Sequence, residues 1–204
     1  MKSKLNKETG SESAALVRDN KFSAWVFKMR GGLWTLLFVI IFIAAKPSVN
    51  SLLSGLWLVI LGQLWRFWAA GCIGRYRGEQ VKALRLATWG PYALMRNPLY
   101  FGNFLIGLGW AVMAGLWTVL IFILGFIILY VLIIIPYEEK FLLNKFGAEY
   151  ENYKLRTGMF APRSKFKLKD LRGDFDAKIL WQSERHTVIT TVIGTCILAA
   201  KIFL

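Results

Sequence analysis

Long apolar runs alternate with charged segments along the whole chain. The runs lie at about residues 33–45, 52–70, 98–114, 116–136 and 186–204. A helix needs about 20 mostly apolar residues to cross the roughly 30 Å hydrocarbon core of a bilayer. We therefore expect an all-α, polytopic membrane protein with about five transmembrane helices. The first run is short, so Gly31, Gly32 and the aromatic residues before them are expected to extend it.

The polar segments divide the chain into parts. We expect residues 1–30 to form a charged, partly disordered N-terminal arm, residues 31–162 a membrane core, and residues 163–185 a charged linker to the last span. Within the core, residues 137–157 show the i, i+4 apolar spacing of two short amphipathic helices. Gly147 is the expected stop between these two helices.

The composition supports an integral membrane protein. Hydrophobic residues make up 56% of the chain, against about 45–50% in soluble domains. The net charge is +14, and its Lys and Arg residues cluster between the apolar runs, which is the positive-inside pattern and attracts anionic lipid. This pattern predicts a cytoplasmic N-terminus, cytoplasmic segments at residues 71–97 and 136–185, and a C-terminus on the opposite side. No recognition motif accompanies the charge, so no nucleic-acid partner is predicted.

Residues that could bind a metal are sparse. Cys72 and Cys196 are far apart, no CxxC pair is present, and His186 is the only histidine. Neither a disulfide framework nor a metal site is predicted. His186 is expected to be an interface residue at the start of the last span.

Gln63 and Arg66 lie inside the second apolar run. A charge within a membrane span is a functional candidate by default. Alternatively, Arg66 lies about one turn from the end of the span, so its stem could carry the guanidinium to the headgroups. The position favours this second interpretation.

The segment at residues 90–102 joins a basic loop to the third apolar run. Pro98 suits the first turn of a helix and Asn97 suits its N-cap. Arg96 then places a cation beside a helix N-terminus that is itself partly positive. These features together predict an anion site at the membrane boundary.

A second patterned segment follows the fourth run. It reads Glu138-Glu139-x-x-Leu142, then Phe146-Gly147-x-x-Tyr150-x-x-Tyr153, and ends Phe160-x-Pro162. With Gly90-Pro91-Tyr92 and Arg96-Asn97-Pro98-x-Tyr100-x-Gly102, it resembles the isoprenylcysteine carboxyl methyltransferase and phospholipid methyltransferase family of integral membrane methyltransferases. The family usually has histidine where this chain has Asn97. Because asparagine does not titrate near neutral pH, Asn97 is expected to be a contact and not a proton shuttle.

The resemblance implies S-adenosylmethionine as the cofactor, held at the cytoplasmic face between the two motifs, and an acceptor that enters from the bilayer. It assigns cofactor contacts to Tyr92, Arg96, Asn97, Pro98, Tyr100, Gly102, Glu138, Glu139, Phe146, Gly147, Tyr150 and Tyr153. The expected catalytic residues are Arg96, Glu138 and Glu139. Arg96 would hold a carboxylate of the cofactor or the acceptor, and the glutamates would hold the cofactor's ammonium or ribose hydroxyls.

Each of these residues also has a structural interpretation. Arg96 is a positive charge of the kind that sets membrane topology, and the glutamates suit the first turn of a helix that starts near Pro136. The tyrosines suit a membrane interface or plain helix packing.

An acceptor that is already ionised needs no base. The expected acceptor is therefore an anionic oxygen, with an isoprenylcysteine-type carboxylate favoured by the resemblance. Methylation of a lipid phosphate, as in lipid A, or of a phospholipid amine headgroup stays open. A different class of enzyme also stays open. The NADPH-dependent sterol-type membrane reductases resemble this chain in an Arg-x-Pro-x-Tyr-x-Gly stretch. A membrane module without catalysis is the third alternative. The oligomeric state is not predicted.

Overall fold

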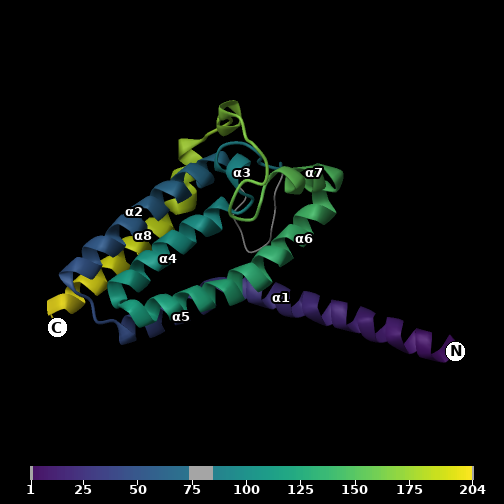
Figure 1. Cartoon of the computed structure of the whole chain (residues 1–204), viewed down its shortest axis with the longest axis horizontal. Coiled ribbons are helices and arrows are strands. Elements are labelled where there is room, and N and C mark those ends of the chain that lie inside the picture. Colours follow the sequence, from purple (N-terminus) through teal and green to yellow (C-terminus); the bar gives the residue numbers. More distant parts are fainter. Residues whose placement is uncertain (1, 74–84, 204) are drawn as a thin grey trace.

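The computed structural model describes residues 2–73 and 85–203, with side chains from residue 21 onward. Regular structure in these ranges is helical, apart from isolated bridges between Met95 and Gly158 and between Thr157 and Pro162 (Figure 1). The elements are α1 (Lys2–Ala44), α2 (Val49–Cys72), α3 (Pro91–Leu94), α4 (Pro98–Ala114), α5 (Leu116–Phe126), the π-helical η1 (Ile127–Ile134), α6 (Ile135–Phe146), α7 (Ala148–Arg156), the 3-10 turn η2 (Leu168–Leu171), α8 (Ala177–Ala200) and the 3-10 turn η3 (Lys201–Phe203).

The expected fold class is confirmed. Four helical stretches within the described residues are long and apolar enough to cross a membrane: Lys21–Ala44, Val49–Cys72, Leu116–Phe146 and Ala177–Phe203. Helix α4 is a shorter apolar helix beside them, with the bounds predicted for the third span. The protein is an all-α, polytopic integral membrane protein.

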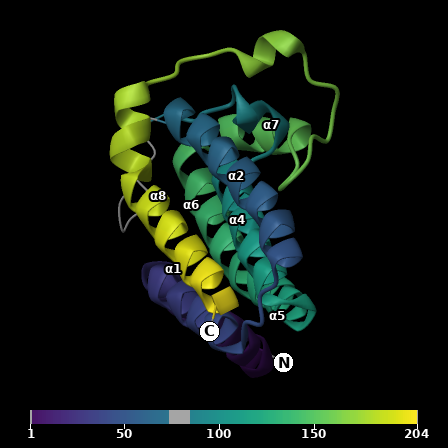
Figure 2. The same cartoon turned by 90° about the vertical axis from the view of Figure 1, so that its left-hand side faces the viewer.

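One end of the bundle gathers the α1–α2 link, the α4–α5 turn and the C-terminus, and the other end carries α3 and α7 (Figures 1 and 2). At the first end, the Lys46 amide donates to the Ala114 carbonyl at 2.9 Å. The Lys201 ammonium donates to the carbonyls of Phe42, Ile43 and Ala45 at 2.7–3.0 Å. Lys201 thereby caps the C-terminal end of α1. Which end faces the cytoplasm stays a prediction.

Helices α2 and α4 approach closely through glycines. A Cβ on Gly55 would lie 2.3 Å from the Gly109 carbonyl oxygen, and one on Gly62 would lie 2.8 Å from the Gly102 carbonyl oxygen. A Cβ on Gly107 would lie 2.3 Å from the Phe122 ring of α5. The small residues of the third span therefore allow close helix packing.

An aromatic core joins α1 to α4, α5 and η1. Trp34 of α1 lies 5.1 Å from Tyr130 of η1, and Phe38 of α1 lies 4.6 Å from Trp110 of α4, measured between ring centroids. Aromatic pairs of this kind add packing energy beyond the area that they bury. This core holds α1 against the rest of the bundle.

Three predicted boundaries are wrong. The first concerns α1, which is helical from Lys2, so the partly disordered arm at residues 1–30 is incorrect and the first candidate span begins at Lys21, not near residue 33. Val26 and Phe27 are buried, and the Phe27 ring lies 5.3 Å from Tyr137 of α6. This tertiary packing stabilises the helix through a stretch whose sequence is polar.

The second concerns Pro136, which does not end the fourth span. Helix continues from Leu116 to Phe146, through η1 into α6. In η1 the amide of Ile135 donates to the carbonyl of Tyr130, five residues back. This wider π-helical turn accommodates the missing amide of Pro136 next to it.

The third concerns the last span, which was expected after a linker at residues 163–185. Helix α8 instead begins at Ala177, because the Asp176 carboxylate accepts hydrogen bonds from the amides of Lys178 and Ile179 at 2.8 and 3.0 Å. His186 is therefore an exposed residue within α8, not one at its start. The earlier start also brings Glu184 into the bundle.

Candidate functional site

The turn between α3 and α4 docks on the chain just after α7. The amide of Arg96 donates to the carbonyl of Gly158 at 2.9 Å, and the amide of Asn97 donates to that of Met159 at 3.3 Å. The Arg96 Nη1 donates to the carbonyl of Thr157. The two sequence motifs, which are more than forty residues apart, therefore meet at this end of the bundle.

Arg96 and Glu139 form an ion pair at this junction. Arg96 Nε donates to Glu139 Oε1 at 2.8 Å, and the two side chains are 5% and 12% exposed. Lys154 of α7 lies 3.2 Å from the other carboxylate oxygen, Oε2, and its side chain is 38% exposed. Glu139 is thus held between two cations, one buried and one partly exposed.

Two tyrosines of α7 are buried next to this pair. Tyr153 donates its hydroxyl to the carbonyl of Tyr92 at 2.8 Å, which joins α7 to α3. Tyr150 is 1% exposed, yet its hydroxyl has no hydrogen-bond partner within the described part of the chain. Burial raises the pKa of both phenols, and the nearby Glu139 carboxylate raises that of Tyr150 further. Both hydroxyls therefore stay protonated at neutral pH, and that of Tyr153 acts as a hydrogen-bond donor.

The remaining predicted contacts fall into different settings. Tyr100 packs its ring 4.9 Å from Tyr130 of η1, and the Glu138 carboxylate lies close enough to act electrostatically on the Tyr100 hydroxyl. Asn97 occupies the N-cap position of α4, as predicted, but its side chain makes no capping bond; its Nδ2 donates to the Met159 carbonyl at 3.4 Å.

Four predicted contacts have a structural explanation. Pro98 is buried at the first position of α4, and Phe146 packs against Tyr150 and Tyr153. Gly147, with φ +49°, makes the turn between α6 and α7, as predicted. Gly102 faces α2, where a Cβ would lie 2.4 Å from the Cγ of Arg66.

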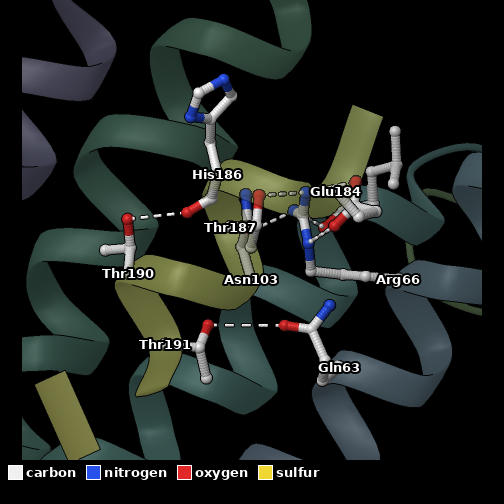
Figure 3. Close-up of polar contacts among 9 residues, drawn as sticks. Gln63, Arg66, Asn103, Glu184, His186, Thr187, Thr190 and Thr191 are labelled. Carbon is white, nitrogen blue, oxygen red and sulfur yellow. Dashed lines mark hydrogen bonds and ion pairs between the residues drawn. The ribbon is translucent and has the colours of Figure 1, made fainter. Parts of the chain in front are cut away.

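A second Arg–Glu pair lies inside the bundle (Figure 3). Arg66 donates from Nε and Nη2 to the two carboxylate oxygens of Glu184 at 2.8 and 2.9 Å. The side chains are 3% and 0% exposed. Arg66 therefore does not reach toward the headgroups, and that interpretation is wrong.

Glu184 and Lys154 were missed by the sequence analysis. Glu184 was placed in the linker before the last span, although Asp176 directly before an apolar stretch is an N-cap signal for an earlier helix start. Lys154 lies inside the second motif, but nothing in its spacing from Glu139 indicates that the two meet.

The segment that carries both motifs is similar to known proteins. The family model described as "Phospholipid methyltransferase" matches residues 50–149. These residues run from α2 to α7 and include both Arg96 and Glu139. This match supports the resemblance to membrane methyltransferases that the two motifs indicate, over a segment that ends before Tyr150 and Tyr153. No solved structure matches the chain.

Three curated relatives are similar over parts of the chain. The nickel-cobalt-cadmium resistance protein NccN of Alcaligenes xylosoxydans xylosoxydans is 29% identical over 73% of this chain and 72% of its own length. The cobalt-zinc-cadmium resistance protein CzcN of Cupriavidus metallidurans is 36% identical over 53% of this chain and 46% of its own length. Methanethiol S-methyltransferase 2 of Bradyrhizobium diazoefficiens is 34% identical over 43% of this chain, which corresponds to 33% of that protein.

Proposed function

We propose that this protein transfers a methyl group from S-adenosylmethionine to an acceptor in or on the membrane. The observation that carries the proposal is the junction of the two motifs, where Arg96 meets Glu139 beside the unpartnered hydroxyl of Tyr150. A buried polar atom without a partner is uncommon in folded proteins and calls for an explanation. A bound cofactor with hydrogen-bond acceptors supplies one.

The residues at this junction fit that cofactor. Its amino-acid end carries a carboxylate and an ammonium group, and Arg96 and Glu139 present the complementary charges. Tyr150, kept protonated by its raised pKa, would donate a hydrogen bond. Glu138 would accept one from the ammonium or a ribose hydroxyl, and Tyr92, Tyr153 and Asn97 would support the surrounding backbone.

The bound cofactor supplies an electrophilic methyl group on a sulfonium. The protein's part is to orient the acceptor in line with that methyl and to exclude water. Arg96 comes from the turn between α3 and α4 and Glu139 from α6, so opposite charges from two parts of the chain would orient a zwitterionic ligand that takes the place of their direct contact. Neither residue has to move a proton if the acceptor arrives ionised.

For the acceptor, we propose an anionic oxygen on a lipid or lipid-linked molecule, with an isoprenylcysteine-type carboxylate first and a lipid phosphate or an amine headgroup as alternatives. Such an acceptor reaches the junction sideways from the bilayer. The positive-inside pattern predicts a cytoplasmic junction and N-terminus, with the C-terminus on the opposite side.

A second candidate acceptor is a small thiol, because a relative that is 34% identical over 43% of this chain is named methanethiol S-methyltransferase. A thiol reacts as its thiolate and so requires a base. Glu138 and Glu139 are the carboxylates at hand for that role.

One assay separates these acceptors. Membranes that contain the protein are incubated with methyl-labelled S-adenosylmethionine, and label is followed in lipid extract, protein and volatile thioether. Label in lipid or protein that survives Glu138→Gln supports an anionic acceptor. Label in the thioether supports the thiol, and its loss in a Glu138→Gln variant that still binds S-adenosylhomocysteine supports Glu138 as the base. Binding of NADPH in place of S-adenosylhomocysteine would instead support the reductase alternative.

A further inference from the structure

The Arg66–Glu184 pair lies at the level of the first turns of α4, directly after the Arg96 motif (Figure 3). We propose that Arg66 is a positioning residue for the cofactor site, and that Glu184 of α8 orients it. This inference rests on the proposed function, because it assigns the pair a role in placing Arg96.

Arg66 joins three helices through one guanidinium. It donates from Nη1 to the Leu99 carbonyl at 3.4 Å and to the Asn103 side chain, both in α4. From Nε and Nη2 it donates to the Glu184 carboxylate in α8, and Nη2 also donates to the Thr187 hydroxyl at 3.2 Å. Because the guanidinium is planar and rigid, the bonds that hold Nε and Nη2 on Glu184 also fix the direction of Nη1 toward α4.

The stem of Arg66 is fixed as well. It crosses α4 at Gly102, where an added Cβ would lie 2.4 Å from the Arg66 Cγ. One turn earlier in α2, a Cβ on Gly62 would lie 2.8 Å from the Gly102 carbonyl oxygen. The glycine of the motif therefore leaves room for the arginine, and any shift of α4 would have to move the arginine too.

The route from this contact to Arg96 is short. Leu99 is three residues after Arg96, and Pro98 between them restricts the backbone. The Arg96 side chain is held from the other side by Glu139 and the Thr157 carbonyl. Arg96 is thus aligned by α4 on one side and by α6 and the end of α7 on the other, and Arg66 fixes the α4 side.

A purely structural pair would behave differently from a positioning pair. Replacing both members of a buried ion pair with apolar residues of similar size is often neutral for stability. If the pair only stabilises the bundle, the double variant Arg66→Met/Glu184→Leu keeps its affinity for cofactor. If the pair positions α4, the double variant folds but has lost the contacts to Leu99 and Asn103, so its site is misaligned.

The test is calorimetric titration of S-adenosylhomocysteine into the purified full chain in detergent. We expect the double variant to bind about tenfold more weakly than the wild type, which is about 1.4 kcal/mol, with an unchanged unfolding temperature. Arg66→Lys keeps a cation opposite Glu184 but loses the planar guanidinium that also donates to α4. It is expected to show the same weakening of S-adenosylhomocysteine binding. The matched control is Thr195→Val, which removes the 3.0 Å bond from Trp110 Nε1 to α8 farther along the same two helices and should bind as the wild type does.

The outcomes separate this inference from the function on which it rests. Affinity within twofold of the wild type in Arg66→Lys overturns the positioning role alone, and this readout serves even if the double variant does not fold. Equally weakened binding of S-adenosylhomocysteine in Thr195→Val would also overturn the positioning role, because any lost contact to α8 would then be enough to weaken binding. A wild type that binds no S-adenosylhomocysteine overturns the proposed function together with this inference.

Discussion

Two Arg–Glu pairs in the described part of the chain share the same 2.8 Å contact between Nε and a carboxylate oxygen but differ in their surroundings. Arg66 and Glu184 are 3% and 0% exposed and bind through both carboxylate oxygens. Arg96 and Glu139 are joined by one such contact, next to a partly exposed lysine and a buried hydroxyl that lacks a partner among the described residues. The first pair has the features of a fixed link between α2 and α8, and the second those that we propose for a site that binds a zwitterionic ligand.

The largest expected effect is on the second pair. Arg96→Ala removes the proposed carboxylate contact, so methyl transfer and S-adenosylhomocysteine binding should both be abolished while the protein still accumulates in membranes. Glu139→Gln should likewise abolish transfer. Labelled-methyl transfer and calorimetry measure these losses.

The matched control is Arg85→Ala. Its arginine also pairs with a carboxylate, Asp174, at 2.8 Å, but the two side chains are 71% and 80% exposed. Activity should be unchanged in this variant. Normal activity in both Arg96→Ala and Glu139→Gln would remove the site assignment.

The next effect is on stability. Glu184→Leu leaves the Arg66 guanidinium buried without its carboxylate, which should lower the free energy of unfolding by about 3–5 kcal/mol. The additional change Arg66→Met should recover most of that loss. Thermal unfolding in detergent measures both, and equal instability of the single and double variants would contradict the comparison of the two pairs.

A smaller stability effect is expected at the glycine over which Arg66 passes. Gly102→Ala should cost about 1–3 kcal/mol, because the added Cβ would lie 2.4 Å from the Arg66 Cγ. In Gly31→Ala nothing lies within 4 Å of the added Cβ, so this helical position should be stabilised by up to about 1 kcal/mol. Chemical denaturation compares them, and an equal response at both positions would show that the close contact at Gly102 is not tight.

The smallest effect is expected at Tyr150. Tyr150→Phe removes a hydroxyl that has no partner among residues 2–73 and 85–203, so stability should be unchanged while cofactor binding weakens by about 1 kcal/mol. Tyr153→Phe removes the bond to the Tyr92 carbonyl and should show the opposite pattern, a stability loss of about 1 kcal/mol. Calorimetry and thermal unfolding of both variants separate the two patterns.

The sequence predicted those parts of the fold that depend on local pattern. The bounds of α4, the turn at Gly147 and the all-α class follow from apolar runs and from residues that end helices. The first candidate span includes Phe27, whose contact with Tyr137 lies more than a hundred residues along the chain and has no local signal. Pro136 does not interrupt the helix, and the π-helical turn before it has no signal in the sequence.

In the candidate site, too, the local motifs indicated some of the residues, and others depend on contacts between distant parts of the chain. The two motifs indicated Arg96, Glu139, Tyr150 and Tyr153, and the structure brings these residues together at one end of the bundle. The Arg66–Glu184 contact joins residues 118 positions apart. No local pattern indicates such a partner, since only the packing of α8 against α2 creates it.

The most direct test of the central claim is one titration of S-adenosylhomocysteine, repeated with NADPH, into the wild type, Arg96→Ala and Arg85→Ala. The account predicts that S-adenosylhomocysteine binds the wild type and Arg85→Ala equally and does not bind Arg96→Ala, and that NADPH binds none of them. Binding of NADPH to the wild type, or undiminished binding of S-adenosylhomocysteine to Arg96→Ala, would contradict it.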